Sequence, residues 1–350
     1  MTQTMKALAK TGPVEGLELI DAPIPEAGPE DVLIRVHRTA VCGTDIHIWN
    51  WDEWSQKNVP TPMITGHEFA GEIVAVGKEV DRPLKIGQRV SAEGHVIDLN
   101  SEAARAGHFH LDPHTRGIGV NRQGAFAEFV VAPAFNVIEL PDDVPYEIGS
   151  ILDPFGNAVH TAQQFDLLGE DVLVTGAGPI GMMAAAVARH AGARTVVLTD
   201  INDFRLDLAQ KVAPGVRTVN TTKEDIHDVM KELGLKVGFD VALEMSGSPV
   251  AFRQCVDTLI MGGGMAMLGI PGKPMETDWG AIILKALTIK GVYGREMFTT
   301  WRKMLGLLKA GLDLSPLITH RLAYVDYREG FEAMKSGQSG KVVLDWDKAA

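Results

Sequence analysis

Two short segments contain a thiol, imidazoles and carboxylates, the side chains that most often bind zinc. Cys42 lies in Ala-Val-Cys-Gly-Thr-Asp-Ile-His (40–47), and His67 and Glu68 lie in Thr-Gly-His-Glu-Phe-Ala-Gly (65–71). A lone cysteine is most often a small buried hydrophobe, and a lone histidine beside glycine is most often a turn residue. Both segments look turn-like and precede a nucleotide-binding pattern. Together they indicate a metal ion that assists hydride transfer.

The nucleotide-binding pattern begins with the strand-like run 172–175 and continues into a glycine motif, G-x-G-x-x-G, at Gly176, Gly178 and Gly181. An apolar helix-like stretch follows directly. The first glycine permits a tight turn, the second lets the backbone approach a pyrophosphate, and the third allows the helix to pack on the strand. The helix N-terminus then faces the phosphates. The alternative is a glycine turn that binds nothing, but the ordered combination favours a dinucleotide site.

An acidic residue is expected about 20 residues after such a motif, and Asp200 stands there after the apolar run 195–199. A carboxylate at this place accepts hydrogen bonds from the ribose hydroxyls and repels a 2′-phosphate. This favours NAD over NADP, although Arg205 is close enough to keep NADP open. The residues that we assign to the cofactor are Gly176, Gly178, Pro179, Ile180, Gly181, Asp200, Arg205, Leu268, Gly269 and Ile270.

The 350 residues are enough for two domains. Short β-like runs fill the first third, for example 32–36 and 69–76, and predict a mostly β domain. From Gly169 onward apolar strands alternate with helical stretches, which predicts an α/β fold: a Rossmann doubly wound parallel sheet. The expected domains are 156–295 for the nucleotide and 1–155 with 296–350 for the mostly β domain. The tail is too short to fold alone and should pack on the first domain.

Composition excludes several classes of protein. The net charge of −12 argues against nucleic acid as a partner. Two cysteines cannot form a disulfide scaffold, which favours a reducing, cytoplasmic location. We expect no signal peptide and, because no apolar window is long enough, no membrane span. Cys255, in the helix-like run 252–259, is expected to be an inert packing residue.

The segments that contain Cys42 and His67, together with the glycine motif, resemble the zinc-dependent medium-chain dehydrogenases over essentially the whole chain. Longer stretches at 49–56, 153–160, 268–271, 294–297 and 336–341 resemble the branch that acts on L-threonine. The resemblance implies a GroES-like catalytic domain beside the Rossmann domain. It also implies oxidation of the 3-hydroxyl of L-threonine to 2-amino-3-oxobutanoate, with NAD as hydride acceptor, in a homotetramer.

The resemblance also assigns residues. Cys42 and His67 would hold the catalytic zinc, with Glu68 and Asp153 as carboxylates that bind in turn; the family often has Glu at the latter position. Thr44 and His47 would relay the hydroxyl proton to solvent. His95 would lie near the substrate, and the alternative for it is a buried core histidine.

The chain departs from the family at a second, structural zinc site, which normally has four cysteines. Their positions are occupied here by Asp98, Ser101, Ala104 and Asp112. We therefore expect one zinc per chain, and a lobe that is looser or held by local packing and a helix around 101–106. His108, His110 and His114 with Asp112 could form a substitute site, but a polar loop is favoured because no ligand pair has an established zinc spacing.

Other functions remain open at this point. One is a dehydrogenase for another secondary alcohol or polyol on the same scaffold. Another is an NAD-binding protein without catalysis, against which the joint presence of the catalytic residues argues. The strands expected at 265–270 and 288–291 could be edge elements of the central sheet and so provide a route to a dimer.

Overall fold

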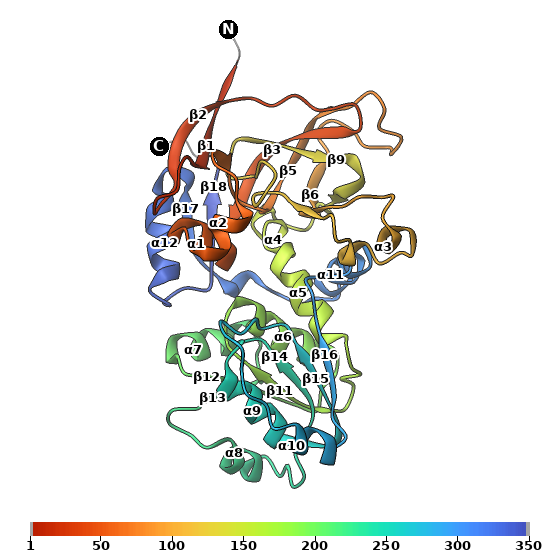
Figure 1. Ribbon diagram of the computed structural model, residues 1–350, viewed down its shortest axis with the longest axis vertical. Helices are drawn as coiled ribbons and strands as arrows, with labels where there is room; N and C mark the ends of the chain where they lie inside the picture. Colours follow the sequence, from red (N-terminus) through yellow and green to blue (C-terminus); the bar gives the residue numbers. More distant parts are fainter. Residues whose placement is uncertain (1–2, 348–350) are drawn as a thin grey trace. The chain divides into compact units, whose positions relative to one another are not determined.

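The computed structural model describes residues 3–347, and these group into two compact units. Unit 1 comprises Met1–Asp153 and Ile318–Ala350, and unit 2 comprises Pro154–Leu317. The colour bar of Figure 1 allows both segments of unit 1 to be followed.

One segment groups differently from our expectation. Residues 296–317, which we expected in the first domain, group with unit 2. Helix α11 (Thr299–Lys309) carries the buried Trp301, whose ring centre lies 5.7 Å from the guanidinium carbon of Arg295. Lys303 on the same helix donates a hydrogen bond to Gln163. Because these partners belong to unit 2, the segment that returns to unit 1 starts at Ile318.

Unit 1 is built mainly from antiparallel strands. In chain order they are β1 (Thr4–Lys10), β2 (Glu18–Pro23), β3 (Asp31–Ala40), β4 (Met63–Ile64), β5 (Glu68–Val76), β6 (Arg89–Ala92), β7 (His95–Val96), β8 (Arg116–Gly117), β9 (Phe129–Pro133), β10 (Val137–Glu139), β17 (Ile318–Ala323) and β18 (Lys341–Asp345). The largest sheet has the order β10-β6-β5-β3-β18-β17, with β9 also paired to β3. Val32, Ile34 and Val36 of β3 alternate into the core, as expected for a strand with one buried face. Because β18 lies between β3 and β17, the end of the chain completes a sheet begun near its start.

Unit 2 contains a six-stranded parallel sheet, as predicted. Its strands are β11 (Asp171–Thr175), β12 (Thr195–Asp200), β13 (Arg217–Asn220), β14 (Phe239–Glu244), β15 (Leu259–Met267) and β16 (Thr288–Gly291). Their order, β13-β12-β11-β14-β15-β16, is that of a Rossmann fold. All of β11 is buried, which is typical of a parallel strand covered on both faces. The expected edge position of 265–270 is wrong, because β15 pairs with both β14 and β16 and ends at Met267.

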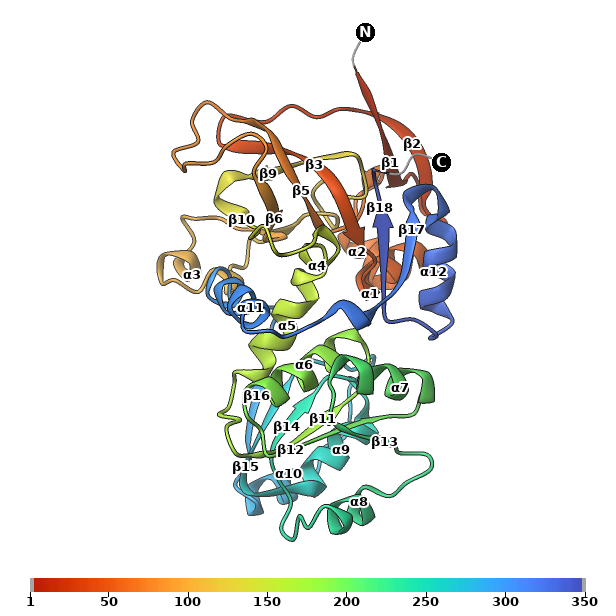
Figure 2. The same ribbon diagram turned by 180° about the vertical axis from the view of Figure 1, so that it is seen from behind.

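Helices connect these strands and cover the sheets. Those of unit 2 besides α11 are α6 (Pro179–His190), α7 (Asp203–Val212), α8 (Ile226–Glu232), α9 (Pro249–Thr258) and α10 (Trp279–Leu284). Unit 1 contains α1 (Gly43–Asn50), α2 (Glu53–Asn58), α3 (Glu102–Arg105), α4 (Tyr146–Gly149) and α12 (Tyr327–Lys335), and α5 (Leu152–Ala162) begins at its last residues. Figure 2 shows α12 beside β17, on which it packs. Within residues 3–347 no helix is long and apolar enough to cross a membrane.

Hydrogen bonds hold the lobe that lacks the family's cysteines. Ser101 caps the short helix α3 by accepting a hydrogen bond of 3.1 Å from the backbone N–H of Ala104. The Asp112 carboxylate accepts the backbone N–H of Asp98 at 2.8 Å and that of His114 at 3.2 Å. Burial opposes ionisation of Asp112, but these bonds outweigh it and lower its pKa. The four positions at which the family resemblance implies zinc-binding cysteines are thus joined here by capping and by one carboxylate.

Candidate metal centre and dinucleotide site

Strands β3 and β5 bring the predicted metal ligands together. In their antiparallel register Ala40 lies opposite Glu68. Cys42 follows β3 and precedes the first turn of α1, and His67 directly precedes β5. One donor atom each of Cys42, His67 and Glu68 lies within 4.8 Å of the others. In the part of the chain that the structure describes, no other three His, Cys, Asp or Glu residues form such a group, so the lobe histidines form none.

The two oxygens of the Glu68 carboxylate have different surroundings. Oε2 accepts a hydrogen bond of 2.5 Å from Nζ of Lys341, and both side chains are buried. Lys341 also donates to the backbone carbonyl of Val41, next to Cys42. Burial raises the pKa of Glu68 above its ordinary value, against the opposing effect of the lysine. Oε1 is buried and has no hydrogen-bond partner within residues 3–347, so one oxygen remains available for a cation.

Asp45 lies next to the other two predicted ligands, Cys42 and His67. Its carboxylate accepts the backbone N–H of Cys42 at 2.8 Å and lies 3.8 Å from Nδ1 of His67. Burial opposes a charge on His67, but the negative groups of Asp45 and Cys42 outweigh it and raise the His67 pKa well above its usual value. The centre thus attracts positive charge. A thiolate, an imidazole and a buried, unpaired carboxylate oxygen fit a zinc ion.

The three glycines of the motif have the geometry that a dinucleotide site requires. Gly176 has φ of +92°, a conformation that favours glycine in the tight turn after β11. A Cβ on Gly181 would lie 1.8 Å from the carbonyl oxygen of Gly176, so only glycine permits this packing of α6. A Cβ on Gly178 would meet no atom within 4 Å. That open space, at the N-terminus of α6, is where a pyrophosphate fits.

Asp200 at the end of β12 is tied to this glycine loop. Its Oδ2 accepts the N–H of Ala177 at 2.6 Å, and its Oδ1 accepts those of Ile201 and Asn202. Arg205 lies in the first turn of α7, and its Nε has no hydrogen-bond partner within residues 3–347. Pro179 and Ile180 form the first turn of α6. The acid, the arginine and the glycine loop therefore lie at the carboxyl ends of two adjacent strands, β11 and β12.

Known proteins resemble the chain over almost its whole length. Residues 28–142 match the model of the alcohol dehydrogenase GroES-like domain, and residues 179–310 match that of the zinc-binding dehydrogenases. The chain is 66% identical to L-threonine 3-dehydrogenase of Ruegeria pomeroyi, over 98% of this chain and all of the relative. It belongs to the L-threonine 3-dehydrogenase family of zinc-binding dehydrogenases. The L-threonine 3-dehydrogenase of Shewanella frigidimarina is 60% identical over 98% of this chain and all of that relative.

A solved structure gives the same fold at greater distance. The 2R,3R-butanediol dehydrogenase of Bacillus subtilis is 27% identical and superposes with a TM-score of 0.88, over 97% of this chain and 99% of that one. The predicted dehydrogenase family, with its Rossmann and GroES-like architecture, is thus confirmed.

The family resemblance also assigned roles to Thr44, His47 and Asp153. Thr44 and His47 lie on α1, and the Thr44 hydroxyl is 3.9 Å from the sulfur of Cys42. Asp153, in the first turn of α5, raises the pKa of His67 and of Glu68 through its negative charge. It is therefore close to the centre, although the group of three mutually adjacent donors does not include it.

His95 forms part of the short strand β7. Its Nδ1 lies 2.8 Å from Oε1 of the buried Glu93, and 27% of its side chain is exposed. It is accordingly not the fully buried core histidine of the alternative interpretation, and its role toward a substrate stays a prediction.

Sequence reasoning missed Glu244, the last residue of β14. Its buried carboxylate accepts N–H groups of Ser246 and Gly247, and its backbone carbonyl accepts those of Leu268 and Gly269. It thus joins the loop after β14 to the loop that contains the predicted cofactor residues 268–270, of which Ile270 is 90% exposed. An acid at the end of an apolar strand was the only available signal.

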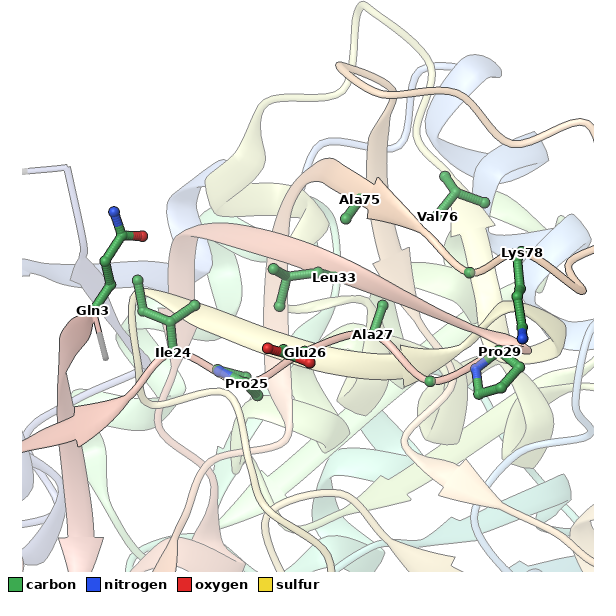
Figure 3. A pocket seen from close by; sticks show the side chains of 12 residues that line it. Gln3, Ile24, Pro25, Glu26, Ala27, Pro29, Leu33, Ala75, Val76 and Lys78 are labelled. Atoms are coloured by element: carbon green, nitrogen blue, oxygen red, sulfur yellow. The ribbon is translucent and has the colours of Figure 1, made fainter. Parts of the chain in front are cut away.

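A separate groove in unit 1 is lined by the loop 24–29 and by the strand end 75–78 (Figure 3). Glu26 and Lys78 are its charged residues, and none of the predicted site residues lines it. The groove therefore carries none of the chemistry described above.

Proposed function

We propose that the chain oxidises the 3-hydroxyl of L-threonine to 2-amino-3-oxobutanoate, with NAD as hydride acceptor. The observation that carries the proposal is the 66% identity to an L-threonine 3-dehydrogenase over 98% of the chain. The clustered Cys42, His67 and Glu68 support it, because they fit the catalytic metal that such a reaction needs. These same residues argue against an NAD-binding protein without catalysis.

In this proposal each residue has a defined task. Cys42 and His67 would hold zinc, with Glu68 and Asp153 as carboxylates that would bind it in turn. When bound, zinc polarises the substrate hydroxyl and NAD accepts the hydride.

Thr44 passes the hydroxyl proton to His47, which lies three residues further on α1 and therefore on the same side of the helix. The His47 side chain is 60% exposed and so can deliver the proton to water. His95 contributes to the substrate pocket.

The experiment that tests the proposal follows NADH formation with L-threonine, D-threonine, sorbitol and 2,3-butanediol at equal concentration. We expect L-threonine to have the highest kcat/KM. A higher value for sorbitol or 2,3-butanediol would replace the proposal by the polyol alternative. Absence of turnover with every substrate, in protein that contains zinc and binds NADH, would favour the non-catalytic alternative.

The proposal includes one zinc per chain. Asp98, Ser101, Ala104 and Asp112 offer no thiolate, and Asp112 already accepts two backbone N–H groups. We expect metal analysis of the purified protein to find close to one zinc per chain, and two per chain would contradict this assignment.

Because a thiolate ligand must stay reduced, we place the protein in the cytoplasm. Both cysteines are free thiols.

Asp200 is proposed to select NAD. We expect Asp200→Ala to weaken NADH binding about tenfold, the effect of losing a hydrogen bond to a charged group, and to weaken NADPH binding less. Fluorescence titration with both cofactors measures this. Asp203→Ala is the matched control, because this carboxylate is 58% exposed and pairs with Lys223. Equal losses for NADH and NADPH would show that Asp200 only supports the glycine loop.

We propose a homotetramer, with the exposed edge strand β16 as one contact. This edge is open on one side in the sheet order, and β15 and α10 beside it expose Met261, Ile283 and Leu284 by more than 70%. Apolar surface next to an unpaired strand edge favours association with a second copy. Light scattering after gel filtration should give four times the mass of one chain, and a monomer would contradict the proposal.

A further inference from the structure

The turn between α1 and α2 has a conformation that its sequence does not favour. Trp51, the residue after α1, has φ of 54° and ψ of 45°, in the left-handed region that non-glycine residues seldom occupy. Lys10 lies over its ring at 5.1 Å, and Gln56 donates a hydrogen bond to its carbonyl. Strain of this kind persists only where surrounding contacts impose it, and it is concentrated at functional sites.

The consequence of this turn is the position of Asp52. Its Oδ1 accepts the backbone N–H of the buried Ser55 at 2.9 Å and the Ser55 hydroxyl at 3.0 Å, which caps α2. Its Oδ2 lies 2.5 Å from Nδ1 of His47, one turn back on α1. Partial burial opposes ionisation of Asp52, but the bonds from Ser55 and His47 lower its pKa. The carboxylate is therefore fixed through one oxygen and presented to His47 through the other.

We propose that Asp52 is a positioning residue of the proton relay, which holds His47 with Nδ1–H bonded to the carboxylate and Nε2 free to accept the proton. The inference rests on the proposed function for the identity of the relay. A carboxylate can only accept a hydrogen bond, so Nδ1 must be the donor nitrogen and Nε2 is left as the base. Capping of α2 requires only Oδ1, so the contact to His47 is additional to the structural role.

The substrate hydroxyl gives its proton to the Thr44 oxygen, while the Thr44 hydroxyl gives its own proton to Nε2 of His47. His47 becomes an imidazolium ion beside the Asp52 carboxylate and then releases the Nε2 proton to water. Both residues return to their starting states.

Two helices, α2 and α12, pack on α1, which carries His47. Helix α2 presents Asp52 and the Trp54 ring, whose centre lies 6.2 Å from that of His47. Helix α12, which also packs on α1, contacts it through Tyr327 and Phe331 at Trp49. In the described part of the chain, Asp52 is the charged residue that pairs with His47.

The test compares the pH profile of kcat/KM for L-threonine in the wild type, Asp52→Asn and Asp347→Asn. The asparagine oxygen still caps α2 but carries no charge. We expect the plateau value of kcat/KM to be about threefold to tenfold lower in Asp52→Asn. This is a part of the rate enhancement that a general base usually contributes. We expect its acidic limb to move to lower pH by about half a unit, as for an exposed ion pair. Zinc content, NADH affinity and unfolding midpoint should stay unchanged.

Asp347→Asn is the matched control, because Asp347 forms a similar bond of 2.7 Å to Nδ1 of His37 away from the metal ligands. Its profile should coincide with that of the wild type. A second comparison uses His47→Asn: adding Asp52→Asn to it should lower the rate no further, since Asp52 acts through His47. A wild-type profile for Asp52→Asn, or an additional loss in the double variant, would overturn the proposal.

A readout that does not depend on turnover separates this inference from the proposed function. Diethyl pyrocarbonate acylates neutral imidazole, and mass spectrometry can follow His47 alone. At pH 6 we expect His47 to react about twofold faster in Asp52→Asn, because more of its imidazole is neutral once the carboxylate charge is removed. Equal rates would refute the Asp52 contact even if L-threonine is oxidised, whereas a faster rate would support it even if L-threonine is not the substrate.

Discussion

Cys42→Ser is expected to lower kcat for L-threonine at least about a thousandfold, because it removes the only thiolate of the metal centre. Lewis-acid assistance contributes several kcal/mol to such reactions, and each 1.36 kcal/mol is about tenfold in rate. Without the thiolate, the imidazole of His67 and the carboxylates of Glu68 and Asp153 bind zinc more weakly, and we expect the variant to lose it. Metal analysis should therefore show zinc lost together with activity.

Two measurements make this prediction specific. NADH affinity should stay within about twofold of the wild type, because the glycine loop and Asp200 belong to unit 2. Cys255→Ser is the matched control: Cys255 is fully buried on α9, where burial raises the pKa of its thiol, and its sulfur lies 4.0 Å from the Thr175 hydroxyl. If Cys42→Ser keeps zinc and turnover, the thiolate is not a ligand and the site must be reassigned.

Lys341→Met is expected to destabilise unit 1 by about 3–5 kcal/mol, the usual result of removing one partner of a buried ion pair. The lysine and Glu68 are both buried, and the variant leaves the carboxylate without its counter-charge. It also removes the donor to the carbonyl of Val41. Chemical denaturation measures the change in the free energy of unfolding. The protein is first treated with a chelator, so that bound zinc does not offset the loss of stability.

The control for this prediction is Lys335→Met on α12. That lysine pairs with Glu15 at 3.1 Å, but the glutamate is 65% exposed, so the loss should stay below about 1 kcal/mol. The double variant Glu68→Gln, Lys341→Met should recover a large part of the stability, because it removes both charges. Similar losses for the two lysine variants would show that the pair at Glu68 is solvated in solution.

Secondary structure was predictable where the pattern is long. The alternating run at 32–36 and the glycine-flanked strand at 172–175 both lie in strands of the structure, β3 and β11. Strands β7 and β8 have two residues each, too few to show a period. The prediction of a turn around Cys42 is wrong, because the segment forms α1 from Gly43 onward. Its β-branched and polar residues favour a helix only weakly, but Asp45 caps the helix, and Ile48 and Trp49 are buried.

The sequence by itself determined which residues could bind zinc and a dinucleotide. A glycine motif between a strand and a helix is a local pattern, and so are the two short segments that contain Cys42 and His67. Only the tertiary structure decided how those residues are held. Lys341 lies 273 residues from Glu68, and a lone charge at the start of an apolar strand does not indicate its partner. Asp52 reaches His47 across a turn in which Trp51 adopts a left-handed conformation. Burial and charge pairing depend on which distant segments meet, and a linear sequence does not contain these distances.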